Sequence, residues 1–337
     1  MNKIYIISNE NFFRIFKEPN NINIYMRVVI TGISSYLASE LYPFLENDNE
    51  IEEVLGIDLV KPSFRSNKLK FIRKDVRDPS IKNQLNGYDA IIHLAFIVSP
   101  LKSEKEMYSI NIEGSKNIFK CAIKAGISKI IHASSVAAYG SFENNPIPIT
   151  EEHPIRLMEK PYYYHETKYV VEKFLDKLEQ QHPDMNIVRL RPHIFLGENI
   201  NNFFQNSFQK ERIYSFFPKN LTQYVWAEDV AQAFYLALKK DLAGAFNLGA
   251  DNPLSSEVIA ERLNKKIINV PYRPALFFMN IFYRLRIIPE ADPGWLRIAK
   301  YPIIVDSSKA KKILEWKPKY DTFGTIQAFL ETMKRKK

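Results

Sequence analysis

Cysteine is nearly missing from this chain of 337 residues, in which Cys121 stands alone. A single cysteine excludes an internal disulfide framework and a cysteine-based metal site. Cys121 lies in an apolar run of helical character, so we expect a core side chain and not a nucleophile. The six histidines have no metal-ligand spacing, and we expect no metal site. This composition fits a reducing compartment, and the expected location is the cytoplasm.

Long hydrophobic runs are missing as well. The apolar stretch from Pro274 to Leu285 is interrupted by polar side chains and is too short to span a bilayer. We expect a helix of a substrate-binding lobe there, with an interfacial membrane helix as the alternative. Residues 1–25 have no sustained apolar core, so a signal peptide is not expected; translation from Met26 and a terminal extension both stay open.

Basic residues outnumber acidic ones, which gives a formal net charge of +9. The two signs are mixed along the chain, and no basic cluster is interleaved with aromatic side chains, so no nucleic-acid partner is expected. The basic tail at 331–337 is expected to be solvated. A positive field is compatible with an anionic small-molecule substrate.

The N-terminal half begins with a nucleotide-binding pattern. Residues 26–31 form an apolar, β-branched run that ends at Gly32, and a helically spaced segment follows. A second apolar run ends in Asp58. Strand, glycine turn, helix and strand-end acid form the pattern of a dinucleotide-binding βαβ unit, in which the helix N-terminus receives the pyrophosphate. Asp58 would bind the adenosine ribose hydroxyls and repel a 2′-phosphate, so we expect NAD and not NADP.

Glycine is scarce, with 11 residues in the chain, and the phosphate turn is depleted of it. Of the three glycines of the pattern Gly-x-x-Gly-x-x-Gly, only Gly32 is present, because Ser35 and Ala38 occupy the other two positions. Alanine at the third position is a mild change. The Ser35 hydroxyl could donate to a phosphate, or its bulk could weaken binding. We expect cofactor binding to be retained.

Further apolar runs alternate with helical stretches along the first two thirds of the chain. One run ends at Asp75, where an acid could meet the adenine edge, and others lie at 89–95 and 129–135. The alternation predicts an α/β fold of the Rossmann type, a doubly wound parallel sheet. We divide the chain into the following parts: an extension (1–25), a cofactor domain (26–195, with 223–247 returning to it), a smaller C-terminal substrate-binding lobe (196–222 and 248–330) and the basic tail (331–337).

Tyr164 and Lys168 carry the clearest chemical signal. Four positions apart on a helix, the two side chains share a face. A cation beside a phenol favours the phenolate, and moving a tyrosine pKa from about 10 to about 7 takes roughly 4 kcal/mol. Ser135, which ends a predicted strand, could hold the substrate oxygen while the tyrosine exchanges its proton. This combination suits hydride transfer at a carbinol carbon.

In their order and spacing, these motifs resemble those of the extended short-chain dehydrogenases/reductases of the NAD-dependent epimerase/dehydratase family. The resemblance runs from Met26 to about Thr325. It is carried by Thr31-Gly32, Asp58, Asp75-Val76, His93-Leu94-Ala95, Asn111-x-x-Gly114, Ser134-Ser135 through Tyr139-Gly140, Tyr164-x-x-x-Lys168, Leu190-Arg191-Pro192 with Gly197, Glu228-Asp229, Phe246 through Gly249, and Asp306 through Pro318.

The resemblance implies an NAD-dependent enzyme, a homodimer, and a role for each site residue. Tyr164 would be the catalytic acid/base, Lys168 would bind the nicotinamide ribose and lower the tyrosine pKa, and Ser135 would orient the substrate hydroxyl. The implied cofactor-binding residues are Gly32, Ser35, Tyr36, Leu37, Asp58, Asp75, Val76, Leu94, Ala95, Asn111, Tyr164, Lys168 and His193.

The reaction type can be narrowed further. Sugar 4,6-dehydratases of the family carry an acidic pair after the catalytic hydroxyl residue, whereas here Val136, Ala137 and Ala138 follow Ser135, which disfavours dehydration. Three functions stay open. They are 4-epimerisation of a nucleoside-diphosphate sugar, net oxidation or reduction as in the 3β-hydroxysteroid dehydrogenase and flavonol reductase branches, and NAD binding without turnover.

The residues that would choose the substrate depart from the sugar-nucleotide pattern. Ile194 stands where the epimerases usually carry asparagine, and no arginine stands near Thr222-Gln223. A diphosphate favours bidentate guanidinium partners. The arginines that could substitute are Arg189, Arg212, Arg284, Arg286 and Arg297.

Overall fold

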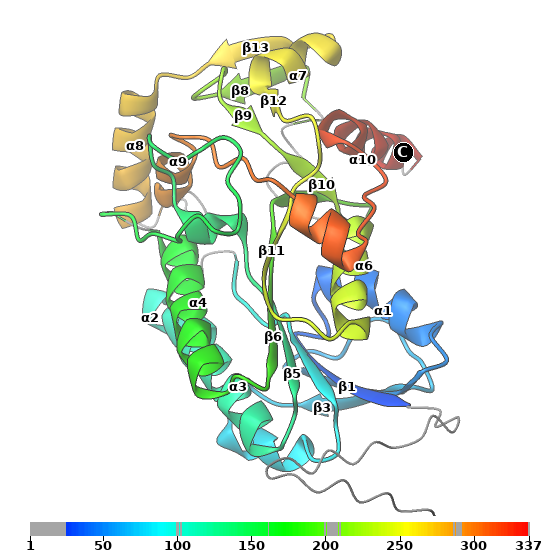
Figure 1. Cartoon of the computed structure of the whole chain (residues 1–337). Coiled ribbons are helices and arrows are strands. Elements are labelled where there is room, and N and C mark those ends of the chain that lie inside the picture. The colour runs from blue at the N-terminus through cyan, green and yellow to red at the C-terminus, as the bar shows by residue number, and fades with distance from the viewer. Residues whose placement is uncertain are drawn as a thin grey trace, which may run out of the picture.

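The computed structural model describes residues 25–98, 101, 103–160, 162–198, 200, 208, 210–285, 287 and 292–335. The expected extension at 1–25 therefore lies outside the described residues except for Tyr25. A central sheet runs through the molecule (Figure 1). Its strands are β1 (Met26–Thr31), β2 (Ile51–Asp58), β3 (Leu69–Arg73), β4 (Ala90–His93), β5 (Lys129–Ala133), β6 (Asn186–Pro192) and β11 (Gly244–Leu248). The order is β11-β6-β5-β4-β1-β2-β3.

Every neighbouring pair in this seven-stranded sheet is parallel. The side chains of β1 explain why both faces are covered. Val28 and Ile30 point into one hydrophobic cluster, and Val29 between them points into a second cluster on the opposite face. β4 and β5 repeat this alternation of apolar side chains, as expected for strands buried on both sides. The predicted doubly wound parallel sheet is confirmed.

Helices lie on both faces of the sheet. One face is covered by α1 (Tyr36–Glu46) and α6 (Ala227–Lys239), which pack against each other, and by the fully buried Trp316. The other face is covered by α3 (Ser115–Lys124) and α4 (Tyr163–Gln181). The short elements α2 (Glu104–Tyr108) and η2 (Ser109–Gly114) lead into α3, where the expected core residue Cys121 is buried.

Outside the central sheet, the described residues form a smaller lobe, which contains three two-stranded sheets and a hydrophobic core of its own (Figure 1). Its elements are β7 (Ile194–Leu196), β8 (Arg212–Ser215), β9 (Leu221–Thr222), β10 (Tyr224–Trp226), β12 (Leu254–Ser255), α7 (Ser256–Arg262), β13 (Lys266–Asn269) and α10 (Thr322–Arg335). The lobe includes β10 and the start of β7, which lie in ranges expected to belong to the cofactor domain, and its role in substrate binding stays a prediction. Lys334 and Arg335 of the expected tail belong to the last turn of α10, where cations are favourable to the helix dipole. The tail expected to begin at residue 331 is thus helical up to residue 335.

Two further helices lie at the side of this lobe. The stretch expected to be helical forms α8 (Tyr272–Arg284), none of whose residues is buried. The short α9 (Gly294–Ile298) lies against the start of α4, where a side chain at Gly294 would overlap Tyr162. Among the described residues, no helix is both long and apolar enough to cross a membrane.

Candidate active site

The turn after β1 brings two strand ends into close approach at Gly32. Its φ is +74°, and a Cβ atom there would lie 2.5 Å from the Ala95 nitrogen, so only glycine fits. The Gly32 N–H donates to Ile57 at 2.8 Å, which ties the turn to β2 as well. Leu94 and Ala95 therefore stand directly beside the turn, at the position where a dinucleotide is expected.

Ser35 has a structural role that its place in the glycine pattern concealed. Its extended backbone and its Oγ, which accepts from the Ala38 N–H at 3.3 Å, make it the N-cap of α1. The next two side chains point into the protein. Leu37 lies in the core, and the Tyr36 hydroxyl occupies the space that a side chain at Gly197 would fill. Tyr36 and Leu37 can therefore offer a cofactor only their backbone N–H groups.

Asp58 ends β2 next to the glycine turn. One carboxylate oxygen accepts from the Ser34 N–H at 3.1 Å, and the other accepts from Leu59 and Val60 at 2.7 and 3.2 Å. The acid thus fastens the turn to the strand end. Its contact with a ribose stays a prediction.

The next strand-end acid, Asp75, is paired within its own loop. It accepts from the Arg77 backbone N–H at 2.9 Å and from the guanidinium at 2.9 and 2.6 Å, and this bonding lowers its pKa below the usual value. Val76 packs against the backbone of Gly114, where a Cβ would lie 2.6 Å from Val76 Cγ2. Contacts of Asp75 and Val76 with adenine stay predictions.

Asn111 holds the loop that follows β4. Its buried amide accepts from the Ile97 N–H at 2.7 Å, donates to the Ile97 carbonyl at 3.0 Å, and reaches Thr167 of α4 at 3.4 Å. Below it, Ser115 donates to the Asn111 carbonyl at 2.6 Å, and His93 contacts Ser115 at 2.8 Å. Asn111 therefore positions the loop on the cofactor side of the site.

Ser135, Tyr164 and Lys168 meet at the carboxyl end of β5. Ser135 begins the short helix η3 (Val136–Tyr139), where its Oγ accepts from the Ala137 N–H at 3.1 Å, and its hydroxyl is near enough to Tyr164 to act on the pKa of the phenol. One turn further along α4, the Lys168 ammonium donates to the Ala133 carbonyl at 2.5 Å. The ammonium lies 5.5 Å from the centre of the Tyr164 ring. The helical spacing places Tyr164 and Lys168 on one face of α4, and the fold brings Ser135 to that face from the end of β5.

The pKa values of Tyr164 and Lys168 differ from those expected for a lysine that lowers the pKa of a neighbouring tyrosine. Burial raises the pKa of Tyr164, and the Ser135 hydroxyl opposes this increase. Burial lowers the pKa of Lys168 to about 7, although the nearby Glu172 opposes the change. The expected lowering of the tyrosine pKa by the lysine is not found here, because the lysine is held by Ala133 and has a weakened preference for its charged form.

Aromatic rings that the sequence did not single out lie around Tyr164. Phe96 lies under the Lys168 ammonium, 3.4 Å from the ring centre, and meets the Tyr164 ring edge-on at 5.9 Å. From the opposite side, Trp295 of α9 stacks on Tyr164 with ring centres 6.3 Å apart and also contacts Tyr162 at 5.1 Å. The tyrosine thus stands in an apolar, aromatic setting, which is the cause of its raised pKa.

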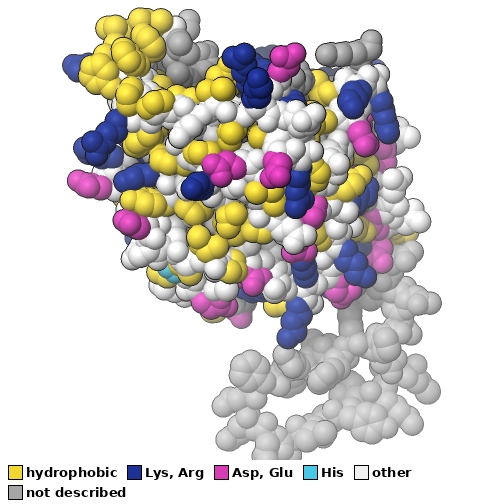
Figure 2. Space-filling view, turned by 90° about the horizontal axis from the view of Figure 1, so that it is seen from above, with side chains coloured by type: hydrophobic (Ala, Val, Ile, Leu, Met, Phe, Trp, Pro, Cys, Tyr) yellow, Lys and Arg dark blue, Asp and Glu magenta, His cyan; other side chains and the backbone are white. Residues whose placement is uncertain are grey.

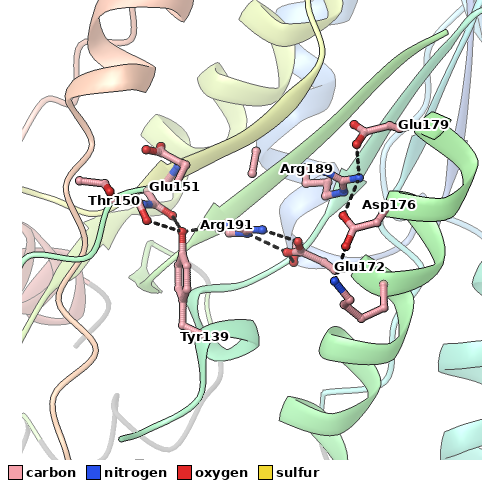
Figure 3. Close-up of polar contacts among 12 residues, drawn as sticks. Tyr139, Thr150, Glu151, Glu172, Asp176, Glu179, Arg189 and Arg191 are labelled. Carbon is pink, nitrogen blue, oxygen red and sulfur yellow. Dashed lines mark hydrogen bonds and ion pairs between the residues drawn. The ribbon is translucent and has the colours of Figure 1, made fainter. Parts of the chain in front are cut away.

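A buried charge network joins α4 to β6 one helical turn beyond Lys168 (Figure 3). Glu172, one turn beyond the lysine, forms a two-pronged ion pair with Arg191 of β6, which also donates to the Tyr139 hydroxyl at 2.7 Å. Ser134 donates to the same carboxylate. Burial would raise the pKa of Glu172, but Arg191 outweighs it and holds the pKa below the usual value. The Glu172 carboxylate is therefore ionised one helical turn beyond Lys168.

His193 stands where β6 leads into β7. Its Nδ1 accepts from the Ile194 N–H at 2.8 Å, so Nε2 carries the proton and donates to the Ile303 carbonyl at 2.9 Å. Burial lowers the pKa of His193 to about 4, and the ring is neutral. The side chain joins the sheet to the segment near residue 303, and its contact with a cofactor stays a prediction.

The sequence contained signals for some of the residues and roles that were not predicted. Glu172, which was not predicted, follows Lys168 at helical spacing, and Ser35, whose capping role was not predicted, precedes a helix, as N-caps do. Phe96 comes directly after the Leu94-Ala95 motif. Trp295 had no signal, because it comes from α9, far along the chain, and reaches the site only through the tertiary fold.

This sheet, with a serine, tyrosine and lysine at its carboxyl edge, defines a short-chain dehydrogenase/reductase. A sequence profile described as the NAD dependent epimerase/dehydratase family matches residues 28–249, and the chain belongs to this family. NAD is accordingly its cofactor. The turn at Gly32 has no room for a side chain, and such a turn is suited to the close approach of a dinucleotide. Bound there, NAD would supply hydride-transfer chemistry.

Several known proteins are similar over nearly the whole chain. A UDP-glucose 4-epimerase of Halalkalibacterium halodurans is 27% identical, with 89% of this chain and 93% of that protein covered. Another from Lactobacillus helveticus is 25% identical, with coverage of 90% and 95%. A crystal structure of UDP-glucose 4-epimerase with UDP-glucose from Thermotoga maritima has a TM-score of 0.72 at 20% identity, covering 92% of this chain and 99% of that one, and supports the fold.

The capping role of Ser35 predicts how two substitutions differ. Ser35→Ala removes the acceptor of the Ala38 N–H and should destabilise the protein by about 1 kcal/mol, whereas Ser35→Gly should cost only a few tenths. Urea unfolding of the cofactor-free proteins measures both. Equal stability of the alanine and glycine variants would contradict the cap.

Lys168→Met should change how stability depends on pH. The lysine has a pKa of about 7 in the folded protein and 10.5 ordinarily. Between these values the unfolded chain binds a proton that the folded protein does not, so the wild type gains stability as pH rises, by at most about 1.4 kcal/mol per unit. Denaturant unfolding should show that, from about pH 7 to pH 9.5, the free energy of unfolding rises more for the wild type than for Lys168→Met.

Lys173→Met is the matched control for this experiment, because Lys173 lies on the same helix with an exposed ammonium paired to Asp176. Its pKa is raised, mainly by that partner, so its loss should leave the pH dependence between about pH 7 and pH 9.5 unchanged. If Lys168→Met and Lys173→Met give parallel profiles, Lys168 does not have a lowered pKa.

Proposed function

We propose that this protein epimerises a nucleoside-diphosphate sugar at a ring carbinol carbon, with NAD as the hydride acceptor and donor. The observation that carries the proposal is the meeting of three side chains at the end of β5: Ser135 acts on the Tyr164 phenol, and the Lys168 ammonium lies on the same face of α4, 5.5 Å from the tyrosine ring. A hydroxyl oxygen bound between the serine and the tyrosine would lose its proton to Tyr164 as its carbon is oxidised. It would regain that proton when the carbon is reduced on the opposite face.

The electrostatic setting supports a proton carrier at this position. In the cofactor-free protein the tyrosine is protonated, because burial raises its pKa. Lys168 would bind the nicotinamide ribose, and in its charged form it would favour the phenolate. Glu172 supports that charged form from the next turn of the helix, since it raises the pKa of the lysine. The network below α4 thus helps to prepare Tyr164 for proton exchange.

The substrate class is supported by relatives and by charge. The two epimerase relatives cover about nine tenths of the chain, and the net charge of +9 favours an anionic substrate. The segment after Ser135, Val136–Tyr139, is buried and has no carboxylate that could assist loss of water. A dehydratase of the same fold, a dTDP-glucose 4,6-dehydratase from Bacillus anthracis in complex with NAD, has a TM-score of 0.70 at 15% identity. That likeness supports the fold and not dehydration.

A second function, net oxidation or reduction of an apolar alcohol or ketone, is favoured by two observations. Aromatic rings lie around Tyr164, and two of the arginines that could bind a diphosphate already have protein partners. Arg189 is paired with Asp176 and Glu179, and Arg297 donates to Asn280 at 3.1 Å. These two guanidiniums are thus engaged by protein partners, and Arg286 lies outside the described residues. A substrate without a diphosphate would suit such a site better.

One experiment separates the two functions. The purified protein is assayed for bound NAD by mass spectrometry and then incubated with UDP-glucose, with UDP-N-acetylglucosamine and, separately, with a hydroxysteroid and added NAD. Interconversion of the sugar epimers without accumulation of NADH supports the epimerase. Steady NADH formation with the steroid, and none of the epimers, would overturn it in favour of the dehydrogenase.

Tyr164→Phe should lower turnover by at least about 100-fold, because a positioned acid/base group contributes that much. The variant should still bind NAD, since the ring and its packing are kept. Tyr163→Phe is the matched control. Its hydroxyl donates to the Val98 carbonyl and not to the serine, so its loss should leave turnover within a few-fold. A Tyr164→Phe variant that turns over at the control's rate would refute the role of the tyrosine.

A further inference from the structure

Helix α8 carries a large apolar surface that the enzymatic function does not use. Phe277 and Phe278 are 62% and 53% exposed, and Leu285 and Ile287 just beyond the helix are 64% and 60% exposed. The two phenylalanine rings contact each other, and Phe278 stacks on Phe282. Figure 2 shows hydrophobic side chains gathered over α8 at one corner of this end of the molecule. Soluble proteins seldom expose such a patch without a partner.

The opposite face of α8 holds the helix to the protein through a few specific contacts. Tyr283 donates to Glu104 of α2 at 2.8 Å, and Arg297 of α9 donates to Asn280 at 3.1 Å. Near its start, the Tyr272 ring contacts Phe217 with centres 5.0 Å apart. None of the residues of α8 belongs to the hydrophobic clusters formed by the described residues. These contacts hold α8 in place through other side chains and leave Phe277 and Phe278 exposed to solvent.

Charge identifies the partner that this face fits. The segment 272–284 has two basic residues, Arg273 and Arg284, near its two ends and no acidic residue, and both arginines are exposed. A second copy of α8 packed on the first would bring like charges together. An anionic surface would instead satisfy both arginines while the phenylalanines enter an apolar layer, which is the binding mode of interfacial amphipathic helices.

We propose that α8 docks this protein on the surface of a bilayer that contains anionic lipids, with Phe277 and Phe278 inserted at the level of the acyl chains. The proposal does not depend on which substrate the enzyme uses. It has a consequence for the site, however, because Arg297 and Trp295 belong to the same short helix, α9, and Trp295 covers Tyr164. The membrane would therefore lie beside α9, whose Trp295 stacks on Tyr164.

Vesicle co-sedimentation of the full chain tests this proposal. We expect binding to vesicles of phosphatidylcholine with phosphatidylglycerol, much weaker binding to phosphatidylcholine alone, and a decrease with added salt. The double variant Phe277→Gln and Phe278→Gln should bind the anionic vesicles at least about ten-fold more weakly, because the inserted apolar area is lost. Arg273→Gln with Arg284→Gln should remove most of the salt dependence.

Control variants change exposed residues outside α8. Tyr214→Gln with Ile313→Gln alters two exposed apolar side chains that do not belong to the helix, and Arg212→Gln with Arg335→Gln alters two exposed arginines. Both control variants should bind vesicles like the wild type. Circular dichroism and thermal unfolding should be the same for all variants, because none of the substituted side chains is buried.

Three outcomes would overturn the proposal. The first is a wild-type protein that does not sediment with anionic vesicles. The second is binding that the Phe277 and Phe278 substitutions leave unchanged. The third is a lipid-free wild-type dimer that becomes monomeric in that variant by analytical ultracentrifugation, because the apolar face would then belong to a second copy of the chain.

Discussion

The site depends on one contact between a helix and a strand end, the bond from the Lys168 ammonium to the Ala133 carbonyl at 2.5 Å. This bond fastens the first turns of α4 to the carboxyl end of β5. Ser135 follows Ala133 by two residues, and Tyr164 precedes Lys168 by one helical turn, so the same bond sets the distance between the serine and the tyrosine. Because all strands of the sheet are parallel, the glycine turn and the loop after β4 emerge at this same edge.

Burying a lysine at this point disfavours its charged form, and neighbouring side chains partly compensate for this electrostatic cost. The ammonium lies on the face of Phe96 and near Glu172, whose own charge is balanced by Arg191. Such a chain of buried charges is stable only when every member keeps its partner, since a buried charge left alone is strongly destabilising. The side chains proposed for catalysis therefore share one face of α4 with the buried charges that affect stability.

The two ends of the molecule differ in how they treat apolar surface. The central sheet is covered on both faces by helices with interlocking apolar side chains, whereas α8 leaves phenylalanines in contact with solvent. The short helix α9 contacts both parts, because its Trp295 stacks on Tyr164 and its Arg297 donates to Asn280 of α8. Tyr164 is thus placed between the edge of the sheet and the side of the molecule on which α8 exposes Phe277 and Phe278.

The sequence by itself determined the sheet, the glycine turn and the serine, tyrosine and lysine, because these depend on local periodicity and on short spacings. Alternating apolar runs specify strands buried on both faces, and a spacing of four places Tyr164 and Lys168 on one helical face. Only the tertiary structure decided what surrounds them. Phe96 and Trp295 reach the site from separate elements and help to bury it, and burial raises the pKa of the tyrosine and lowers that of the lysine. Arg191, from β6, holds the neighbouring Glu172 in its charged form. Burial and long-range contacts depend on the whole fold, so local sequence could not reveal them.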